Sequence, residues 1–244
     1  MDLSFITGPF HTIIFEPLLN LLIIVFNILP GDDLGIAIIV VTLLIRLVLY
    51  PLSYKALRSQ RKITDLQPQL KEIQEKHKKD KQAQSKAVME FYKEHGVNPF
   101  AGCLPFLIQI PILLGLYRVF LMELTPENLS GLYFFVSQPA HINSVFLGIV
   151  DLSIPSPTLA ILAGFAQYLH SRITFSQKKN LGIPAANKSG APDFQKVLGK
   201  QMMYILPVVT IFIAWRFPAG LALYWLTTTL FSFGQQYVIN RRIK

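Results

Sequence analysis

Long apolar runs alternate with shorter polar segments along this chain. A helix needs about 20 consecutive, mostly apolar residues to cross the ~30 Å hydrocarbon core of a bilayer. Five stretches meet that requirement, and they lie at residues 34–54, 100–122, 158–175, 197–215 and 219–238. The pattern therefore predicts an all-α membrane protein with five transmembrane helices.

An earlier apolar run, residues 13–29, differs from these five because Glu16, Pro17, Asn20 and Asn27 interrupt it. An apolar helix with polar residues at intervals favours a position in the plane of the membrane surface over a full crossing. We therefore expect an amphipathic interfacial helix near the N-terminus.

The polar segment after the first expected span, residues 55–98, has helical periodicity. Its apolar residues form two helically spaced groups, Leu66, Leu70 and Ile73, then Val88, Phe91 and Tyr92. We expect a cytoplasmic hairpin of two antiparallel helices there, and a Gly- and Pro-rich cytoplasmic loop at 176–196. The expected organisation is an extracytoplasmic segment, 1–33, followed by a five-span core, 34–244.

Composition and charge agree with this picture and add an orientation. The chain is 52% hydrophobic and only 15% charged, against roughly 25% charged in soluble domains. Residues 55–98, 172–203 and 239–244 hold 20 of the 23 Lys and Arg, whereas residues 1–33 and 122–157 hold none. Because short cytoplasmic loops collect basic residues, we expect a multi-pass protein of the bacterial plasma membrane, the inner membrane of the cell, with its N-terminus outside and its C-terminus in the cytoplasm.

The formal net charge of +9 follows from this topology, since anionic lipid attracts basic segments on the cytoplasmic face. Ribosomal RNA is a second possible partner for the same basic surface, whereas DNA is not expected.

Catalytic and metal-binding patterns are not found in the sequence. The five histidines lack metal-ligand spacing, and there is no phosphate loop or nucleophile motif. Cys103 is the single cysteine, and none of the acids falls inside the five expected spans. We therefore expect a protein that is not an enzyme and that needs no cofactor and no metal.

Arg46 is the most informative residue, because it lies inside the first expected span. An arginine near mid-membrane costs at least ~2.5–3.5 kcal/mol. Thr42, Arg46 and Tyr50 are spaced four residues apart and so share one helical face. With no acid in the spans to neutralise it, Arg46 is available to a visiting anion.

Other polar residues lie in the spans and are candidates for the same site. Gln109 stands between Pro105 and Pro111 in the second span, and Gln167 lies in the third. A proline cannot donate a backbone hydrogen bond, so the second span should bend and leave carbonyls in search of partners.

The fifth span adds Tyr224, Trp225 and the run Thr227 to Thr229. If these faces converge, Arg46 lies in a hydrated cavity rather than in lipid. The alternatives are that the Thr and Gln side chains only join helices, at perhaps ~0.6 kcal/mol each, and that the two aromatic residues belong to an interfacial belt.

Three stretches together resemble the YidC-type membrane protein insertases, which have mitochondrial and thylakoid relatives. They are LLIRLVLYPL at 43–52, YKEHGVNPFAGCLPFLIQIPILLGLY at 92–117 and FPAGLALYW at 217–225. The resemblance covers nearly the whole chain from about residue 34 to 236, and it is to the short, five-span bacterial form.

The resemblance implies a five-span core with a groove that is open to the cytoplasm and to lipid and closed toward the outside. The groove arginine of the family matches Arg46, its neighbouring threonine matches Thr42, and its aromatic residue matches Tyr224. Gln167 matches the family's polar residue on the third span only loosely. With Tyr50, Gln109 and Trp225, these residues form the expected substrate-binding groove.

The expected function is that of a membrane protein insertase and chaperone. It would move short, often acidic segments of nascent membrane proteins across the bilayer through the Arg46 groove, without nucleotide hydrolysis. The expected partners are nascent membrane proteins and the lipid bilayer, with the ribosome, the signal recognition particle machinery and the secretory translocon as further possible partners. The alternatives are a small anion channel or transporter that uses the same arginine, and a structural membrane protein without insertion activity.

Overall fold

The computed structural model describes residues 8–98, 104–121, 129, 131–176 and 194–242. The described chain is mostly helical, as the sequence predicts. In chain order the elements are the π-helix η1 (His11–Phe15), α2 (Glu16–Ile28), α3 (Leu34–Val48), α4 (Tyr50–Asp65), α5 (Gln67–Lys76), α6 (Lys81–Glu94), α7 (Leu104–Leu121), strands β1 (Val145–Phe146) and β2 (Val150–Asp151), α8 (Pro157–Ser176), α9 (Phe194–Arg216) and α10 (Ala219–Arg242).

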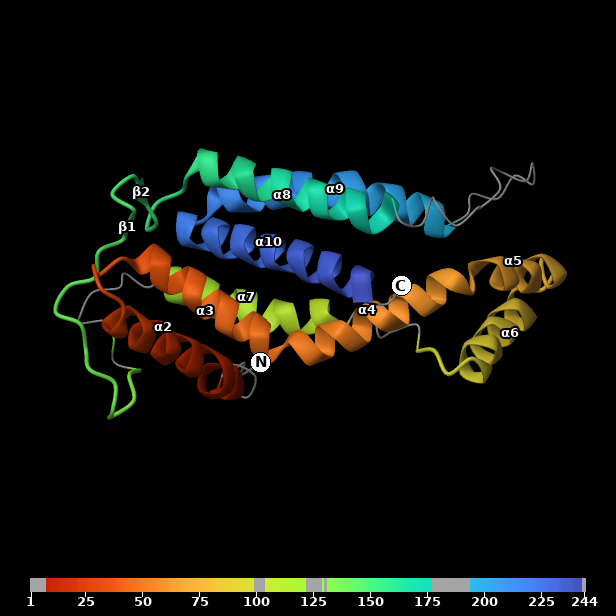
Figure 1. Ribbon diagram of the computed structural model, residues 1–244, viewed down its shortest axis with the longest axis horizontal. Helices are drawn as coiled ribbons and strands as arrows, with labels where there is room; N and C mark the ends of the chain where they lie inside the picture. The colour runs from red at the N-terminus through yellow and green to blue at the C-terminus, as the bar shows by residue number, and fades with distance from the viewer. Residues whose placement is uncertain (1–7, 99–103, 122–128, 130, 177–193, 243–244) are drawn as a thin grey trace, which may run out of the picture.

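The long helices run roughly along the longest axis of the molecule (Figure 1). α8 and α9 pack together along one side, and α10 lies between that pair and α3 and α7. α2 packs against α3 and α7 on the opposite side. The α5–α6 hairpin extends from one end of the bundle, and the β1–β2 hairpin lies at the other (Figure 1). α10 is therefore the central helix that contacts both halves.

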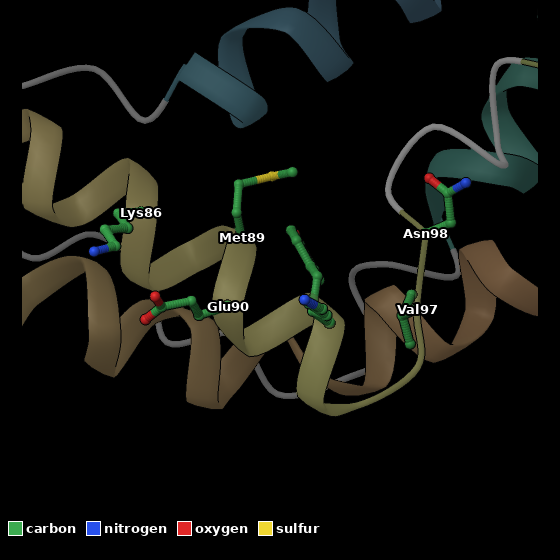
Figure 2. Close-up of a pocket in the computed structure, with 7 residues that line it drawn as sticks. Lys86, Met89, Glu90, Val97 and Asn98 are labelled. Atoms are coloured by element: carbon green, nitrogen blue, oxygen red, sulfur yellow. The ribbon is translucent and has the colours of Figure 1, made fainter.

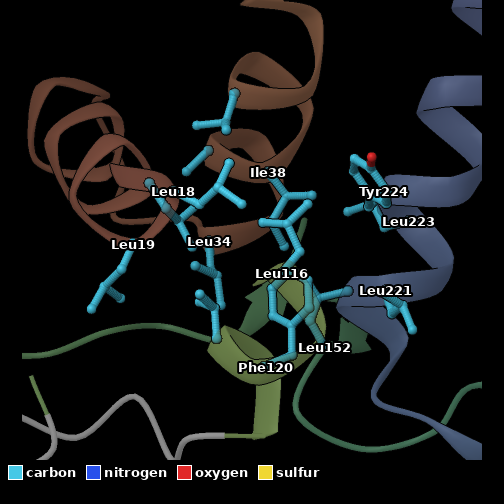
Figure 3. Packing of buried hydrophobic residues seen from close by; sticks show 14 of the residues in the cluster. Leu18, Leu19, Leu34, Ile38, Leu116, Phe120, Leu152, Leu221, Leu223 and Tyr224 are labelled. Carbon is cyan, nitrogen blue, oxygen red and sulfur yellow. The ribbon is translucent and has the colours of Figure 1, made fainter. Parts of the chain in front are cut away.

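One hydrophobic core joins α2, α3, α7 and α10 (Figure 3). Leu19 of α2, Ile38 of α3, Leu116 of α7 and Leu223 of α10 are each at most 3% exposed. Because these residues come from the two ends of the sequence, the N-terminal helix is an integral part of the core.

Small residues let α8 pack closely against its neighbours. Ala160 and Ala163 are fully buried, and a Cβ added to Gly164 would lie 2.1 Å from Ile211 of α9. Helices in lipid associate largely through such close backbone approach, since lipid tails are as apolar as leucine.

The first expected span, 34–54, is broken. α3 and α4 meet at Leu49 at an angle of 60°. Pro51 lies in the first turn of α4, where its missing N–H costs no helical hydrogen bond of α4. It cannot donate to the carbonyl of Leu47, however, so α3 ends just before it.

The expected hairpin forms as α5 and α6, and α4 completes it. Leu70, Phe91, Tyr92 and Val97 form a second small core with Ile63 and other residues around it. Asp80 caps α6 through hydrogen bonds from the backbone of Gln82 and Ala83. Desolvation in this core raises the pKa of Tyr92. The hairpin thus has packing of its own, separate from the main core.

An irregular segment, residues 131–137, is joined to α2 by two asparagines. The Asn20 amide donates to the carbonyl of Gly131 at 2.9 Å and accepts from the backbone N–H of Tyr133 at 2.7 Å. One heptad later, Asn27 donates to the carbonyl of Ser137 at 2.7 Å. The polar residues that interrupt this apolar helix therefore satisfy the backbone of a neighbouring loop.

Irregular backbone is not tolerated where it faces hydrocarbon, so segment 131–137 is expected at a membrane surface. Phe134 and Phe135 in the same segment are 101% and 62% exposed, which suits aromatic residues at a membrane surface. The placement of this segment stays a prediction. α2 itself belongs to the helical run Gly8–Ile28, which is long and apolar enough to cross a membrane, so the structure does not support the expected interfacial position.

Asp33 joins α3 to the β1–β2 hairpin. One carboxylate oxygen accepts from the backbone N–H groups of Gly35 and Ile36, which caps α3, and the other accepts from Leu147 at 2.8 Å. In β2, hydrogen bonds from Ser153 hold the pKa of Asp151 below its usual value.

Fewer helices of the structure are long and apolar enough to cross a membrane than the five spans that the sequence predicts. Among the described residues, the helical run Gly8–Ile28 qualifies by itself, and α3 with α4 qualifies if the bent pair counts as one span. Leu107–Leu121 and Met203–Arg216 pass only as shorter apolar helices. The count of five spans therefore stays a prediction.

We expect Leu70→Ala to loosen the hairpin without loosening the bundle. Leu70 is 1% exposed in the small core, and removing a buried leucine side chain costs about 2–5 kcal/mol. Hydrogen–deuterium exchange in detergent should show faster exchange in α5 and α6 and unchanged exchange in α10. Equal acceleration in both would mean that the two cores unfold together.

We expect Asn20→Leu to destabilise the contact between α2 and residues 131–137. The change removes the partners of partly buried backbone groups, and a fully buried group left unsatisfied costs about 1–3 kcal/mol. The protein should unfold at lower temperature in lipid nanodiscs. Asn27→Leu is the matched control, because Asn27 makes the same kind of bond at an exposed site and should have a smaller effect.

Candidate functional site

Arg46 lies in the last turn of α3, just before the break at Leu49. The C-terminal end of a helix carries unsatisfied carbonyls and a partial negative charge, so a cation is stabilised there. The side chain is half-buried. The helix break therefore lowers part of the cost of placing a charge among apolar residues.

The guanidinium of Arg46 is hydrogen-bonded to an amide. Its Nη2 donates to Oε1 of Gln109 on α7 at 2.8 Å, and the Nε2 of Gln109 donates to the hydroxyl of Tyr224 on α10. Tyr224 is only 2% exposed. We call these three residues the Arg46 cluster, and it connects three separate helices through neutral partners.

Gln109 accepts only a small part of the hydrogen bonds that the Arg46 guanidinium can donate. A guanidinium has five N–H donors, and one amide oxygen cannot take them all. All acids of the chain lie outside the five expected spans. Among the residues that the structure describes, Arg46 forms no ion pair with a carboxylate, and its side-chain hydrogen bond goes to the neutral amide of Gln109.

Thr42 lies four residues before Arg46 within α3 and so shares its helical face, whereas Tyr50 lies beyond the break. The Thr42 hydroxyl is buried and donates to the carbonyl of Ile38 within its own helix at 2.6 Å. Tyr50 follows the 60° break and begins α4. The break interrupts the helical periodicity on which the prediction of a shared face for Tyr50 relied.

Gln167 and Trp225 belong to a neighbouring contact between α8 and α10. Thr229 donates to Oε1 of Gln167 at 3.3 Å and to the carbonyl of Trp225 at 2.9 Å. Gln167 thus makes an interhelical hydrogen bond, which is the role that the sequence analysis gave as the alternative to lining the groove.

A second pair strengthens the same contact. Thr174 of α8 donates to Oε1 of Gln236 on α10 at 3.1 Å. It lies seven residues beyond Gln167, and Gln236 lies seven beyond Thr229, so the two parallel helices are held in register at two levels. We call these two pairs the α8–α10 clasps.

His170 of α8 is a residue that the sequence analysis did not assign to the site. It is half-buried and lies within electrostatic range of Arg46. A histidine within an expected span was a signal that could have identified it, because ionisable residues at membrane depth are rare.

Two residues named in the sequence analysis cannot be placed in the site. Cys103 lies outside the described residues, and so does the side chain of Pro105, whereas Pro111 lies inside α7.

No group of three or more metal-ligating side chains occurs among the residues that the structure describes.

A surface pocket of about 420 Å³ lies on the hairpin rather than at the Arg46 cluster. Lys86, Met89 and Glu90 of α6 line it, with Val97 and Asn98 of the turn that follows (Figure 2). Its walls come from α6 and this turn, so we treat it as separate from the candidate site.

Comparison with known proteins agrees with this architecture. The family model described as "60Kd inner membrane protein" matches residues 25–244. Proteins named membrane protein insertase YidC from Francisella tularensis subsp. novicida (strain U112) and subsp. tularensis (strain SCHU S4 / Schu 4) are 40% identical over 209 residues, which is 85% of this chain and 32% of each relative. The chain therefore spans about a third of the length of these relatives.

A solved structure, described as an active YidC insertase crystal structure with the first transmembrane domain resolved, is similar with a TM-score of 0.54 and 26% identity. The alignment covers 97% of this chain and 47% of that one. The matched residues include Arg46, Gln109 and Tyr224, since the family model extends from residue 25 to the C-terminus. This chain belongs to the 60Kd inner membrane protein family, the family of the YidC insertases, and is a membrane protein.

Proposed function

We propose that this chain is a membrane protein insertase that moves short, often acidic segments of nascent proteins across the bilayer, with no nucleotide hydrolysis. The observation that carries the proposal is the Arg46 cluster. The Arg46 guanidinium is hydrogen-bonded to the neutral amide of Gln109, which is bonded in turn to the Tyr224 hydroxyl, so an acidic segment can pair with the charge. The YidC name of the relatives supports the same function.

The physical problem for a nascent chain is the cost of moving charged residues through about 30 Å of hydrocarbon. Each Asp at the centre of a span costs about 2.5–3.5 kcal/mol on insertion scales. A hydrated groove that reaches Arg46 from the cytoplasm shortens the apolar path and offers the acid a partner part of the way across.

Apolar surface beside the charge would receive the hydrophobic part of the substrate. Leu43 and Leu47 flank Arg46 on α3 and are 36% and 57% exposed. Partition of an apolar helix from here into lipid gains about 25 cal/mol per Å² of surface removed from water. With the outside positive, the membrane potential adds ~2.3 kcal/mol per negative charge per 100 mV.

We infer the membrane orientation of the chain and its cytoplasmic partners from the distribution of Lys and Arg. The N-terminus lies outside, and the basic hairpin and C-terminus lie in the cytoplasm, where Lys and Arg are retained. The hairpin is then the element that extends farthest into the cytoplasm (Figure 1). It is the surface that we assign to the ribosome, the signal recognition particle machinery or the translocon.

An anion channel or transporter is the second candidate, because it could use the same unneutralised arginine. A channel needs a path open on both sides of the membrane. Chloride flux into liposomes that contain the purified protein distinguishes the two: flux without insertion of a single-span substrate would replace our proposal.

We expect Arg46→Ala to impair insertion of substrates with acidic translocated tails more than that of substrates with uncharged tails. Removal of the cation removes the partner of the tail, and a loss of one charge-assisted hydrogen bond of about 1.5–3 kcal/mol corresponds to roughly a tenfold effect or more. Arg46→Lys should retain more activity because it keeps the charge.

The measurement is insertion of matched Asp-tail and Asn-tail substrates in cells depleted of their own insertase. Membrane levels of each variant serve as the control for folding. If Arg46→Ala inserted the Asp-tail and Asn-tail substrates in the same ratio as the wild type does, the electrostatic part of the proposal would be wrong.

A further inference from the structure

Gln109 occupies the position that a substrate carboxylate would take. Its Oε1 accepts from the Arg46 guanidinium at 2.8 Å, and an oxygen acceptor at that distance is what an Asp or Glu side chain supplies. Gln109 comes from α7, 63 residues away from Arg46 in sequence. The contact therefore depends on the packing of two helices and is not a local feature of α3.

Arg46 determines which way the Gln109 amide faces, because a guanidinium only donates and therefore takes the amide oxygen. The Nε2 of Gln109 is then left to donate to the Tyr224 hydroxyl. Tyr224 is buried at 2% exposure on the central helix α10, so its hydroxyl is held in place by the core. The amide is thus presented to Arg46 as an acceptor and not as a donor.

The hydrogen bond between Arg46 and Gln109 is weaker than an ion pair but more favourable than leaving Arg46 without a partner. An amide oxygen is a neutral acceptor, whereas a carboxylate can accept from a guanidinium through two oxygens and with full charge assistance. A carboxylate would therefore displace the amide. After the substrate leaves, the amide can return, so Arg46 is not left without a partner in an apolar site.

From this geometry we propose that Gln109 is the resting partner and positioning residue of Arg46. It holds the guanidinium between α3, α7 and α10 while the site is empty, exchanges with the carboxylate of an incoming acidic segment, and returns when that segment leaves. This inference rests on the proposed insertase function. It makes Gln109 a determinant of how strongly the site prefers acidic over uncharged tails.

The test compares two substitutions by the ratio of Asp-tail to Asn-tail insertion, which a purely structural role of Gln109 would leave unchanged. Gln109→Glu keeps the size and shape of the side chain but gives Arg46 a permanent ionic partner. Gln109→Leu keeps the volume approximately but removes the partner. If Gln109 only packed between helices, each variant would change insertion of the Asp-tail and Asn-tail substrates by the same factor, and neither ratio would change.

We expect Gln109→Glu to lower the ratio of Asp-tail to Asn-tail insertion about tenfold, toward the ratio of Arg46→Ala, because an ion pair is much stronger than the neutral contact. We expect Gln109→Leu to keep a ratio at or above that of the wild type. In photo-crosslinking from the tail to the groove, the Asp-tail substrate should also stay bound longer to the leucine variant.

The matched control is Gln236→Glu. It introduces the same charge at another amide of the bundle, one whose hydroxyl partner is Thr174 and not Arg46. Its ratio should fall much less than that of Gln109→Glu. Thermal unfolding of all variants in nanodiscs reports any loss of the fold separately.

The outcomes separate the two proposals. A reduced ratio for Arg46→Ala together with wild-type ratios for both Gln109 variants would overturn the role of Gln109 and leave the insertase mechanism in place. An unchanged ratio for Arg46→Ala would overturn the electrostatic mechanism itself. An equal decrease for Gln109→Glu and Gln236→Glu would also overturn the inference, since any added charge would then have the same effect.

Discussion

A positive charge placed among apolar helices must be solvated by the protein, and most of the polar architecture around Arg46 follows from that constraint. Three structural features share the cost: the carbonyl end of α3, the amide of Gln109 and the buried phenol of Tyr224. Neutral dipoles solvate a cation without cancelling it. A buried carboxylate would give a more stable resting state, but it would also occupy the site that an acidic substrate needs.

The same constraint applies to backbone groups, and the protein meets it with side-chain amides. Asn20 and Asn27 satisfy the irregular segment 131–137, and the α8–α10 clasps hold two parallel helices in register. In each case the polar side chain looks like a defect when only the hydropathy of its own helix is considered. Its partner on another element explains it.

The fold also separates a stable part from a peripheral one. The central core joins α2, α3, α7 and α10, whereas the hairpin α5–α6 packs on α4 around a small core of its own. The hairpin surface can therefore vary without disturbing the Arg46 cluster. That division fits the insertase function proposed above, in which the hairpin would meet cytoplasmic partners.

Hydropathy and charge along the sequence were enough to predict a mostly helical membrane protein, and they singled out Arg46 and Gln109 as candidate site residues, a role that stays a prediction. Hydropathy and charge depend on residues that are close together in the chain, so a single sequence is enough to evaluate them. The resemblance through residues 92–117 added the family, which the comparisons then established.

Only the tertiary structure decided which polar residues meet. The sequence gives the periodicity of each helix but not its rotation about its axis or its register against its neighbours. For that reason Thr42 turned out to bond within its own helix, Gln167 paired with Thr229, and the break at Leu49 separated Tyr50 from Arg46. The link from Arg46 through Gln109 to Tyr224 depends on three packed helices at once, and no segment of the chain by itself could determine it.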